Sequence, residues 1–260
     1  MRVDDRLPMP QTGLPAADPP AELPTALGDS ALQSQTLESV AGAVNYHDWL
    51  TSMAVPFLGD HPVELGSGLG DYAEQWLAAG IPELSVTEID PTRLAGLARR
   101  FTDQPRVHVR PLDIFKPPVA DHSALVAYNV LEHIPDDVTA LRAAHRLLRP
   151  GGAVVMFVPA FEFAMSTFDR KVGHVRRYTV RSMTATMQQA GLTVERCHYV
   201  NIPGLAAWFV GMRLFRLTPG NDGRLLATWD NQVIPRTRRW ESTHRAPFGQ
   251  SVFAVARVSG

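Results

Sequence analysis

The chain has 260 residues, of which 45% are hydrophobic, and its formal net charge is −1. This length and composition suffice for a substantial core, and we favour one large domain with additions over two small domains. The near-zero charge gives no electrostatic reason to expect a nucleic-acid partner, whose binding normally needs a concentrated basic surface. The single cysteine, Cys197, excludes an intramolecular disulfide and is expected to be a small buried residue.

The N-terminal residues 1–30 contain six prolines among alanines and acids. Such a segment cannot sustain a helix or bury much surface, so we expect a disordered tail. The first residues lead into prolines rather than into an apolar stretch, which predicts no secretory signal and a cytoplasmic protein. From Ala31 to Phe57, apolar residues recur at roughly helical intervals, which predicts an N-terminal helical segment.

The most informative stretch is Val63–Gly70, a short apolar entry followed by Gly66, Gly68 and Gly70. It predicts a buried strand that breaks into a tight turn, where the missing Cβ atoms let a ligand approach the backbone closely. A glycine turn alone is weak support for a ligand. However, the segment Leu84–Glu88 follows as a second strand that ends in an acid, at the spacing where a carboxylate accepts hydrogen bonds from ribose hydroxyls. We therefore expect a ligand that carries a ribose.

The spacing of the glycines indicates which nucleoside is bound. In the dinucleotide fingerprint, the third glycine follows the second by three residues, so that the helix N-terminus can take a pyrophosphate. Here the glycines are evenly spaced, and Asp71 at the start of the next helix would repel a diphosphate. The stretch Glu64–Gly70 resembles the first motif, E/D-x-G-x-G-x-G, of the class I S-adenosylmethionine-dependent methyltransferases. The resemblance runs from about Asn45 to Val258 and implies S-adenosyl-L-methionine as the cofactor.

Downstream of the glycines, helical and strand patterns alternate, which indicates a parallel sheet with helices on both faces. The predicted helices are 71–79, 91–101, 136–148 and 180–190, and the further predicted strands are 84–88, 106–109, 124–128, 153–158, 193–200 and 250–258. The resemblance implies a Rossmann-like α/β fold with a seven-stranded sheet whose last strand is antiparallel. The methyltransferase domain would span 31–260, with N-terminal lid helices at 31–60 and a helical insertion at 202–249.

The resemblance also implies which residues hold the cofactor. Glu64 would orient the glycine turn, and Glu88 would bind the ribose. Asp113 would accept from the exocyclic amine of adenine, because a carboxylate only accepts and that amine only donates; its rival role is that of a turn residue. The stretch N-x-L-E-H from Asn129 would lie under the methionine portion. The full predicted set is Glu64, Gly66, Ser67, Gly68, Gly70, Glu88, Ile89, Asp113, Ile114, Asn129 and Val130.

Charged, aromatic and hydrogen-bonding residues are concentrated in the stretch Phe168–Thr179, between the fifth strand and the next helix. We expect a loop near the carboxyl edge of the sheet, where donor methyl and acceptor meet. Transfer to a hydroxyl requires removal of a proton, and the pKa of histidine suits that work. His174 is the preferred base and His133 competes with it, with Glu132 and Asp169 as the other candidate catalytic residues.

The same loop also has a structural interpretation. Asp169 could pair with Arg176 or Arg177, because opposite charges lie within reach along a short loop. Tyr178 could pack in the core, and Thr179 could cap the following helix. For Thr179 we prefer this structural role.

The loop pattern G-H-x-R-R-Y-T is similar to a branch of methyltransferases found beside glycosyltransferases and cell-envelope or glycan genes. Among characterised enzymes, this resemblance suggests a mycobacterial-type mannoside O-methyltransferase of methylmannose polysaccharide synthesis. It implies a hydroxyl of a sugar or a lipid-linked saccharide as acceptor. The residues expected at the acceptor are Tyr46, Trp49, Arg176, Arg177 and Tyr178, although both aromatic residues of the N-terminal segment equally suit packing of the lid. The alternatives are a small aromatic, quinone or amine acceptor, and a non-catalytic cofactor-binding module.

Two further features of the sequence are compatible with more than one kind of partner. Residues 202–217 are apolar but interrupted by arginines and too short to span a bilayer comfortably, so they would cover the acceptor pocket, form a subunit contact in a homodimer, or make a peripheral membrane contact. Asp169, His174, Glu132 and His133 could hold a divalent metal such as magnesium, although no spacing demands one.

Overall fold

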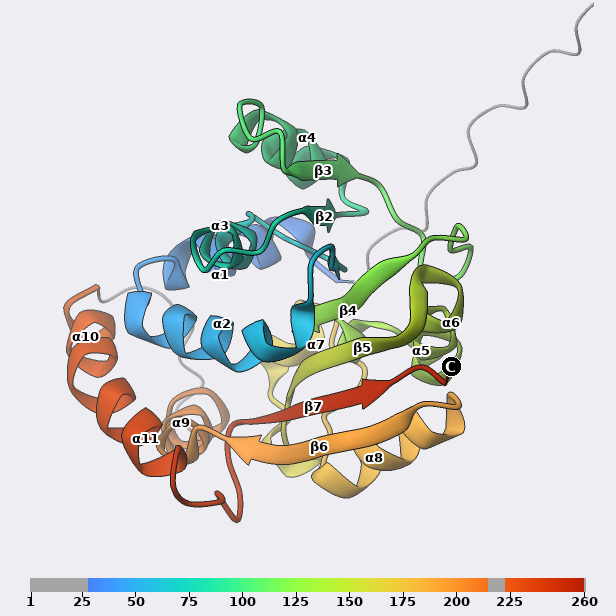
Figure 1. The fold of residues 1–260 in the computed structure, drawn as a ribbon. Helices are drawn as coiled ribbons and strands as arrows, with labels where there is room; N and C mark the ends of the chain where they lie inside the picture. Colours follow the sequence, from blue (N-terminus) through green and yellow to red (C-terminus); the bar gives the residue numbers. More distant parts are fainter. Residues whose placement is uncertain (1–27, 215–222, 260) are drawn as a thin grey trace, which may run out of the picture.

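The computed structural model describes residues 28–214 and 223–259, and these form a seven-stranded sheet in the order β3-β2-β1-β4-β5-β7-β6 (Figure 1). β7 runs antiparallel to both of its neighbours, whereas the pairs among β1 to β5 are parallel. The predicted fold class, including the antiparallel last strand, is confirmed. The strands are β1 (Val63–Glu64), β2 (Leu84–Thr87), β3 (Val107–Arg110), β4 (His122–Tyr128), β5 (Leu148–Pro159), β6 (Thr193–Val200) and β7 (Ser251–Arg257).

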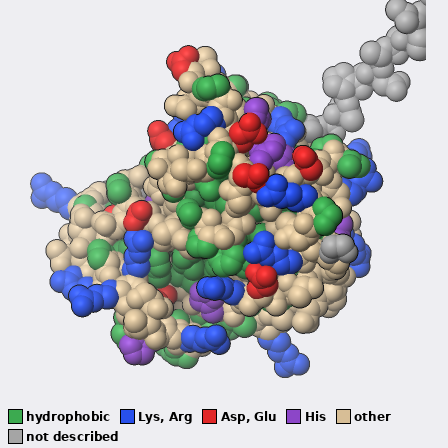
Figure 2. All heavy atoms as spheres, in the orientation of Figure 1, with side chains coloured by type: hydrophobic (Ala, Val, Ile, Leu, Met, Phe, Trp, Pro, Cys, Tyr) green, Lys and Arg blue, Asp and Glu red, His purple; other side chains and the backbone are tan. Residues whose placement is uncertain are grey.

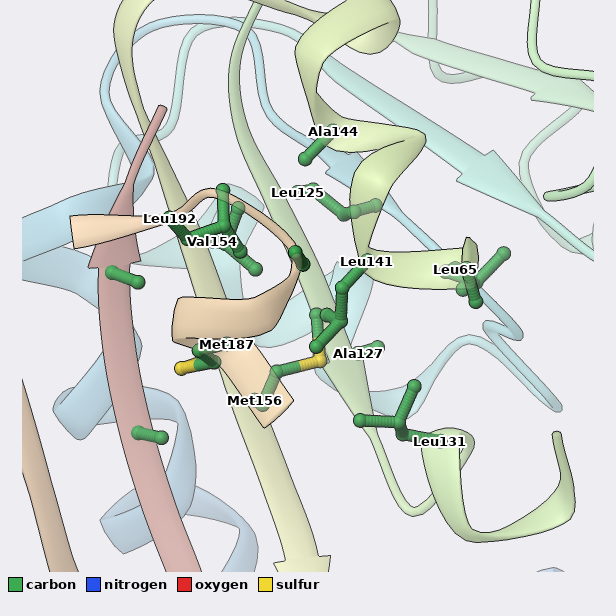
Figure 3. Packing of buried hydrophobic residues seen from close by; sticks show 14 of the residues in the cluster. Leu65, Leu125, Ala127, Leu131, Leu141, Ala144, Val154, Met156, Met187 and Leu192 are labelled. Carbon is green, nitrogen blue, oxygen red and sulfur yellow. The ribbon is translucent and has the colours of Figure 1, made fainter. Parts of the chain in front are cut away.

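Both faces of the sheet are covered because its central strands are apolar on both sides, as is typical of parallel strands. Along β4, Leu125 and Ala127 enter one core cluster, whereas Val126 and Tyr128 enter the other. Figure 3 shows the first cluster, in which helix side chains meet those of β4 and β5. This face carries α5 (Asp137–Arg142), α6 (Ala144–Leu147) and α8 (Val180–Gln189), and the opposite face carries α2 (Val44–Leu58), α3 (Asp71–Ala78) and α4 (Pro91–Arg100).

The predicted N-terminal helical segment consists of two helices, α1 (Ser30–Val40) and α2, separated by a turn at residues 41–43. The Oγ of Ser30 donates to Asp90 Oδ2 at 2.6 Å, just before α4. The Nε2 of Gln33 donates to the carbonyl of Val172 at 2.7 Å. Helix α1 thus links the start of α4 to the segment that follows β5. Residues 1–27 of the predicted tail lie outside the described residues.

The predicted loop 168–179 starts with a short helix, α7 (Thr167–Lys171), so the loop prediction is wrong there. The Oγ of Ser166 accepts from the backbone N–H of Asp169, whose carboxylate accepts in turn from the backbone N–H of Ser166. This reciprocal capping box starts the helix, and the Ser-x-x-Asp spacing is the signal that would have found it. The structural interpretation of Thr179 is confirmed, because its Oγ1 accepts from the backbone N–H of Ser182 at the start of α8.

Other boundaries differ modestly from the predicted ones. The predicted helix 136–148 is divided into α5 and α6, because the backbone N–H of Ala143 donates to the carbonyl of Ala140 and tightens the helix there. Strand β5 begins at Leu148, before the predicted segment 153–158.

The region between β6 and β7 is mostly helical up to Glu241 where it is described, and turns and bends follow at 242–250. It contains α9 (Ile202–Trp208), α10 (Gly223–Thr228) and α11 (Ile234–Glu241), with π-helical turns at Phe209–Leu214 and Trp229–Val233. Among the described helices, none combines the length and the apolar character that crossing a membrane demands. Residues 215–217 of the predicted apolar stretch lie outside the described part.

This region is joined to α2 by Asp230, whose side chain is 3% exposed. The residue before α2, Ala43, offers no side-chain cap. Instead, Asp230 accepts from the backbone N–H groups of Asn45 and Tyr46, both at 2.9 Å. A carboxylate nearly two hundred residues away in sequence therefore caps the first turn of α2, and its charge also suits the positive end of the helix dipole.

We expect Asp230→Ala to lower the free energy of unfolding by about 2 kcal/mol, because it leaves two N–H groups of α2 without their acceptor. Urea denaturation monitored by circular dichroism measures the change. Asp48→Ala is the matched control: Asp48 lies exposed on the same helix and pairs with Arg238 at the surface, so its loss should cost less than about 1 kcal/mol. Equal effects of the two substitutions would contradict the capping role.

Candidate active site

The glycine turn after β1 has the backbone conformation that its sequence predicts. Gly66, Gly68 and Gly70 have φ values of 67°, 58° and 90°, a region that side chains with a Cβ rarely adopt. A Cβ on Gly66 would lie 2.7 Å from Cγ2 of Val130, and one on Gly68 would lie 3.0 Å from Cδ1 of Leu37 in α1. The turn is therefore enclosed by the loop after β4 and by α1, and only glycine fits it.

Glu88, at the end of β2, holds the glycine turn in place. Its Oε2 accepts from the backbone N–H of Gly68 at 3.2 Å, and its Oε1 accepts from the N–H groups of Ile89 and Asp90. The guanidinium of Arg93 donates to the same carboxylate, with Nε 3.1 Å from Oε2. Both Glu88 and Arg93 are buried, so this is an interior ion pair. Glu88, the predicted ribose-binding acid, thus lies at the glycine turn, and both of its carboxylate oxygens accept hydrogen bonds from protein groups.

Arg93 is a residue that the sequence prediction missed. Its Nη1 donates to the Oγ of Ser30 at 3.1 Å, so the guanidinium joins Glu88 to α1. Arg93 lies on α4 just after the capping residue Asp90 and in the helix's first turn. The sequence predicted that Arg93 lies in a helix. It could not predict where the side chain points, because that depends on how α1 packs.

Glu64 contributes a buried acid without compensation. It is 3% exposed, and no hydrogen-bond partner lies at its Oε2 in the described residues. Burial raises the pKa of Glu64 to about 8, and the nearby carboxylates of Asp71 and Glu88 raise it further against the opposing hydrogen bond with Ser67. A ligand that brings a positive charge to this position would compensate the carboxylate, so the site fits a cationic donor such as a sulfonium with an ammonium group.

The loops after β3 and β4 complete this side of the site. Asp113 accepts from the backbone N–H of Phe115 at 2.9 Å, the contact expected of the rival turn role. Ile114 beside it is buried. Asn129 has a φ of 54°, an uncommon conformation for a residue with a side chain, and it opens the loop that brings Val130 against Gly66.

A cluster of acids and histidines follows directly after Val130. The Nδ1 of His174 lies 2.8 Å from Oδ1 of Asp169, which is fully buried. Arg177 also donates to Oδ1 of Asp169, from Nη2 at 2.7 Å. Burial alone would raise the pKa of Asp169, but the hydrogen bond from His174 and the charge of Arg177 outweigh it and hold that pKa well below the usual range. Asp169 is therefore a carboxylate that fixes His174 in one orientation.

Glu132 and His133 face the other side of His174. The Nε2 of His174 lies 3.8 Å from Oε1 of Glu132, and the rings of His133 and His174 are 4.6 Å apart, edge to face. Burial raises the pKa of Glu132 to about 7, opposed by the charge of His174. Burial lowers the pKa of His133 to about 3, and the charges of His174 and Arg93 lower it further. All four predicted catalytic residues therefore lie in one cluster, close to the glycine turn.

The predicted acceptor residues are engaged within the protein. The hydroxyl of Tyr178, whose residue is 2% exposed, donates to Oδ2 of Asp137 at 2.9 Å. Arg176 pairs with the same carboxylate at 2.6 Å. The guanidinium of Arg177 lies over the ring of Trp208, 4.8 Å from its centre. These contacts give the three residues structural partners, in line with the structural interpretation of the loop.

Tyr46 and Trp49 are packed against aromatic side chains. Trp49 is 5% exposed and belongs to the core cluster under α2, where Tyr46 meets it edge to face. Trp49 also lines a groove of about 860 Å³ between α2, β6 and α11, and Figure 2 shows a hollow with hydrophobic side chains on this face. No glycine of the turn lines this groove. The contacts of Tyr46 and Trp49 therefore support their packing role rather than a role at the acceptor.

The comparisons with known proteins agree with this architecture. Residues 63–154 match a family described as a methyltransferase domain. An uncharacterized methyltransferase of Mycobacterium bovis is 30% identical over 130 residues, which make up 49% of this chain and 50% of that protein. An uncharacterized 37.1 kDa protein from a transposon of Streptomyces fradiae is 33% identical over 138 residues, 52% of this chain and 39% of that protein. The chain thus spans half or less of the length of these relatives.

Solved structures with the same architecture are more distant in sequence. A Haloferax volcanii complex with the Trm112 methyltransferase activator contains a chain that superposes with a TM-score of 0.59 at 17% identity, covering 89% of this chain and 99% of that chain. Geranyl diphosphate methyltransferase in complex with SAM gives 0.59 at 12% identity, covering 89% and 96%. At such identities the likeness shows the fold alone.

The fold is the predicted one, and residues 63–154 match a methyltransferase domain, in agreement with the predicted enzyme class. Because this segment and the relatives cover only part of the chain and of the relatives' length, the methyl donor S-adenosyl-L-methionine and the activity of the whole protein belong to the proposed function. The matched segment ends before the G-H-x-R-R-Y-T pattern at residues 173–179, so the predicted branch remains a prediction.

The uncompensated Glu64 predicts an effect of pH on stability. Its folded-state pKa of about 8 lies above the value of 4.5 for a free side chain, so between these two values the folded protein keeps a proton that the unfolded chain has lost. We therefore expect the ligand-free protein to lose stability as pH rises from about 5 to about 8. Glu64→Gln should reduce that loss by more than about 1 kcal/mol.

Urea denaturation of both proteins at pH 5, 6, 7 and 8 measures this difference. Glu74→Gln is the control, because Glu74 lies exposed on α3 next to the same turn. If the wild-type and Glu64→Gln proteins show parallel pH profiles, the assignment of a protonated Glu64 is wrong.

Proposed function

We propose that this protein transfers a methyl group from S-adenosylmethionine to a hydroxyl oxygen of a sugar or a lipid-linked saccharide. The acceptor would be a small molecule or an oligosaccharide. The observation that carries this proposal is the position of the histidine cluster beside the glycine turn. Val130 contacts Gly66, and Glu132 and His133 follow it within three residues. The predicted cytoplasmic location belongs to this proposal.

The cofactor side of the site fits a nucleoside with a cationic tail. The uncompensated carboxyl of Glu64 suits the charge of the donor, and Glu88 suits its ribose if the hydroxyls take over part of the contacts that Arg93 and the backbone now make. When the donor is bound, it supplies an activated methyl carbon. The acceptor oxygen bonds to this carbon while the carbon–sulfur bond breaks, and the sulfur keeps the electron pair as S-adenosylhomocysteine.

The acceptor side requires a group that takes the hydroxyl proton. Asp169 is held as a carboxylate and can only accept, so Nδ1 of His174 carries a proton and Nε2 of a neutral His174 has a free lone pair. This is the geometry of a positioned base, with Asp169 and Arg177 fixing the ring. His133, whose pKa is low, is the second candidate. Catalysis would depend mainly on positioning the acceptor in line with the methyl group.

The acceptor class is tested with labelled S-adenosylmethionine and separate pools of saccharides, lipid-linked saccharides, aromatic and quinone compounds, and amines. We expect label only in the saccharide pools, in a methyl–oxygen bond that mild base does not cleave. Label in the aromatic, quinone or amine pool would replace the saccharide assignment. Binding of the donor with no transfer to any pool would favour a non-catalytic module.

Two substitutions distinguish the acceptor side of the site from the cofactor side. His174→Ala should lower turnover at least about 100-fold and leave the calorimetric affinity for S-adenosylhomocysteine within about threefold, because His174 contacts only the acceptor side. Glu88→Ala should weaken that affinity about 10- to 100-fold, since charge-assisted hydrogen bonds to the nucleoside and the glycine turn are lost.

Glu83→Ala is the control for Glu88, because Glu83 lies exposed just before the same strand. Full turnover of His174→Ala would remove the histidine from the mechanism. Unchanged affinity of Glu88→Ala would place the nucleoside elsewhere.

A further inference from the structure

Three buried side-chain atoms near His174, two carboxyl oxygens and one ring nitrogen, lack hydrogen-bond partners among the described residues. Glu132 is fully buried, and neither of its carboxyl oxygens has a hydrogen-bond partner among the described residues. The Nδ1 of His133 is likewise without one. The Nε2 of His174 comes no closer to Glu132 than 3.8 Å, which is too long for a hydrogen bond. Buried polar atoms are rarely left in this state, so the cluster calls for a ligand that satisfies all three residues.

The ring of His174 is held in one orientation by Asp169. Its Nδ1 donates to that carboxylate, which leaves Nε2 as the lone-pair nitrogen toward Glu132. A histidine that donates through one nitrogen and presents the other is arranged as metal-ligating histidines are. His133 adds a buried ring nitrogen, Nδ1, that has no partner among the described residues.

We propose that Glu132, His133 and His174 bind one divalent first-row transition-metal ion, such as Zn²⁺ or Mn²⁺. Their ligand atoms all lie within 4.8 Å of one another. Around a cation with bonds of about 2.1 Å, ligand atoms lie roughly 3 to 4 Å apart, so small side-chain adjustments close the site. One cation would satisfy the orphaned carboxylate and both imidazole nitrogens, which a proton shared between His174 and Glu132 does not.

The ligand set indicates the kind of metal. Two imidazole nitrogens and one carboxylate suit zinc, manganese and iron, whereas magnesium prefers oxygen ligands and retains its waters. The magnesium considered from the sequence is therefore the less suitable ion. Three protein ligands also leave coordination positions for water or an acceptor oxygen, as in catalytic rather than structural metal sites.

A second group in the described residues provides a comparison. His61, Glu83 and His108 also lie within metal-binding distance of one another, but Glu83 and His108 are exposed. His61 is further engaged through Nε2 with Ser85 at 3.3 Å. This group lacks a buried orphaned carboxylate, so it serves as the control site.

The role of the metal in catalysis rests on the proposed function. With the cation bound, Nε2 of His174 would be a ligand, so the role of base that the proposed function gives this nitrogen would apply to the metal-free protein only. The acceptor hydroxyl would then bind at an open position, where the cation lowers its pKa so that its proton passes to solvent before or as the oxygen attacks the methyl carbon.

Metal binding is tested on the full chain without donor or acceptor, so that it does not depend on transfer activity. After treatment with a chelator and its removal, we expect one equivalent of Zn²⁺ or Mn²⁺ by elemental analysis and calorimetry, and weaker binding of Mg²⁺. Glu132→Gln and His133→Ala, checked for folding by thermal denaturation, should each lose the metal. Asp169→Asn should weaken its affinity about 10- to 100-fold by releasing the ring of His174.

His61→Ala should retain one equivalent with unchanged affinity. The proposal is overturned if the folded wild-type protein binds no transition metal at micromolar concentrations, or if a folded Glu132→Gln or His133→Ala variant binds it as tightly as wild type. Metal binding without methyl transfer would contradict the proposed function alone. Full transfer by the metal-free protein would contradict the catalytic role of the metal and leave methyl transfer standing.

Discussion

The burial of four carboxylates around the glycine turn and the histidine cluster is the constraint on which the rest of this structure depends. Glu64, Glu88, Glu132 and Asp169 are each at most 5% exposed. A buried charge is costly unless it is paired and hydrogen-bonded, so each of these acids needs a partner. Glu88 and Asp169 each pair with an arginine, whereas Glu64 and Glu132 have no arginine partner among residues 28–214 and 223–259. The paired acids form the scaffold, and the unpaired acids mark where a cationic ligand is expected.

The arginines of the paired acids also link segments that the sheet alone does not bring together. Arg93 joins Glu88 to Ser30, and so connects the glycine turn to α1. Arg177 joins Asp169 to the aromatic ring of Trp208 at the end of α9. Since removal of either acid would leave an arginine buried without its partner, the scaffold and the site depend on the same contacts.

The sheet was predictable from the sequence because its signals are local. Runs of apolar residues marked β4, β5 and β7, and the glycine spacing marked the turn after β1. Contacts between distant segments were not predictable. The cap of α2 by Asp230 connects residues nearly two hundred positions apart, and no propensity of either segment indicates it. The capping box of Ser166 and Asp169 was local and could have been found, but the density of charges there favoured a loop.

The pattern G-H-x-R-R-Y-T shows that residue types alone cannot distinguish residues that bind a ligand from residues that hold a neighbouring side chain in position. Arginine, tyrosine and histidine are the side chains that recognise polar ligands, yet here Arg176 and Tyr178 both engage Asp137, and Arg177 engages Asp169. Their common effect is to anchor the segment on both sides of His174 while leaving its Nε2 turned toward Glu132. The pattern is therefore explained by the need to hold one imidazole in a fixed position. These internal contacts would hold His174 in the same way for any acceptor, so the choice among acceptors must depend on groups that meet the open side of His174.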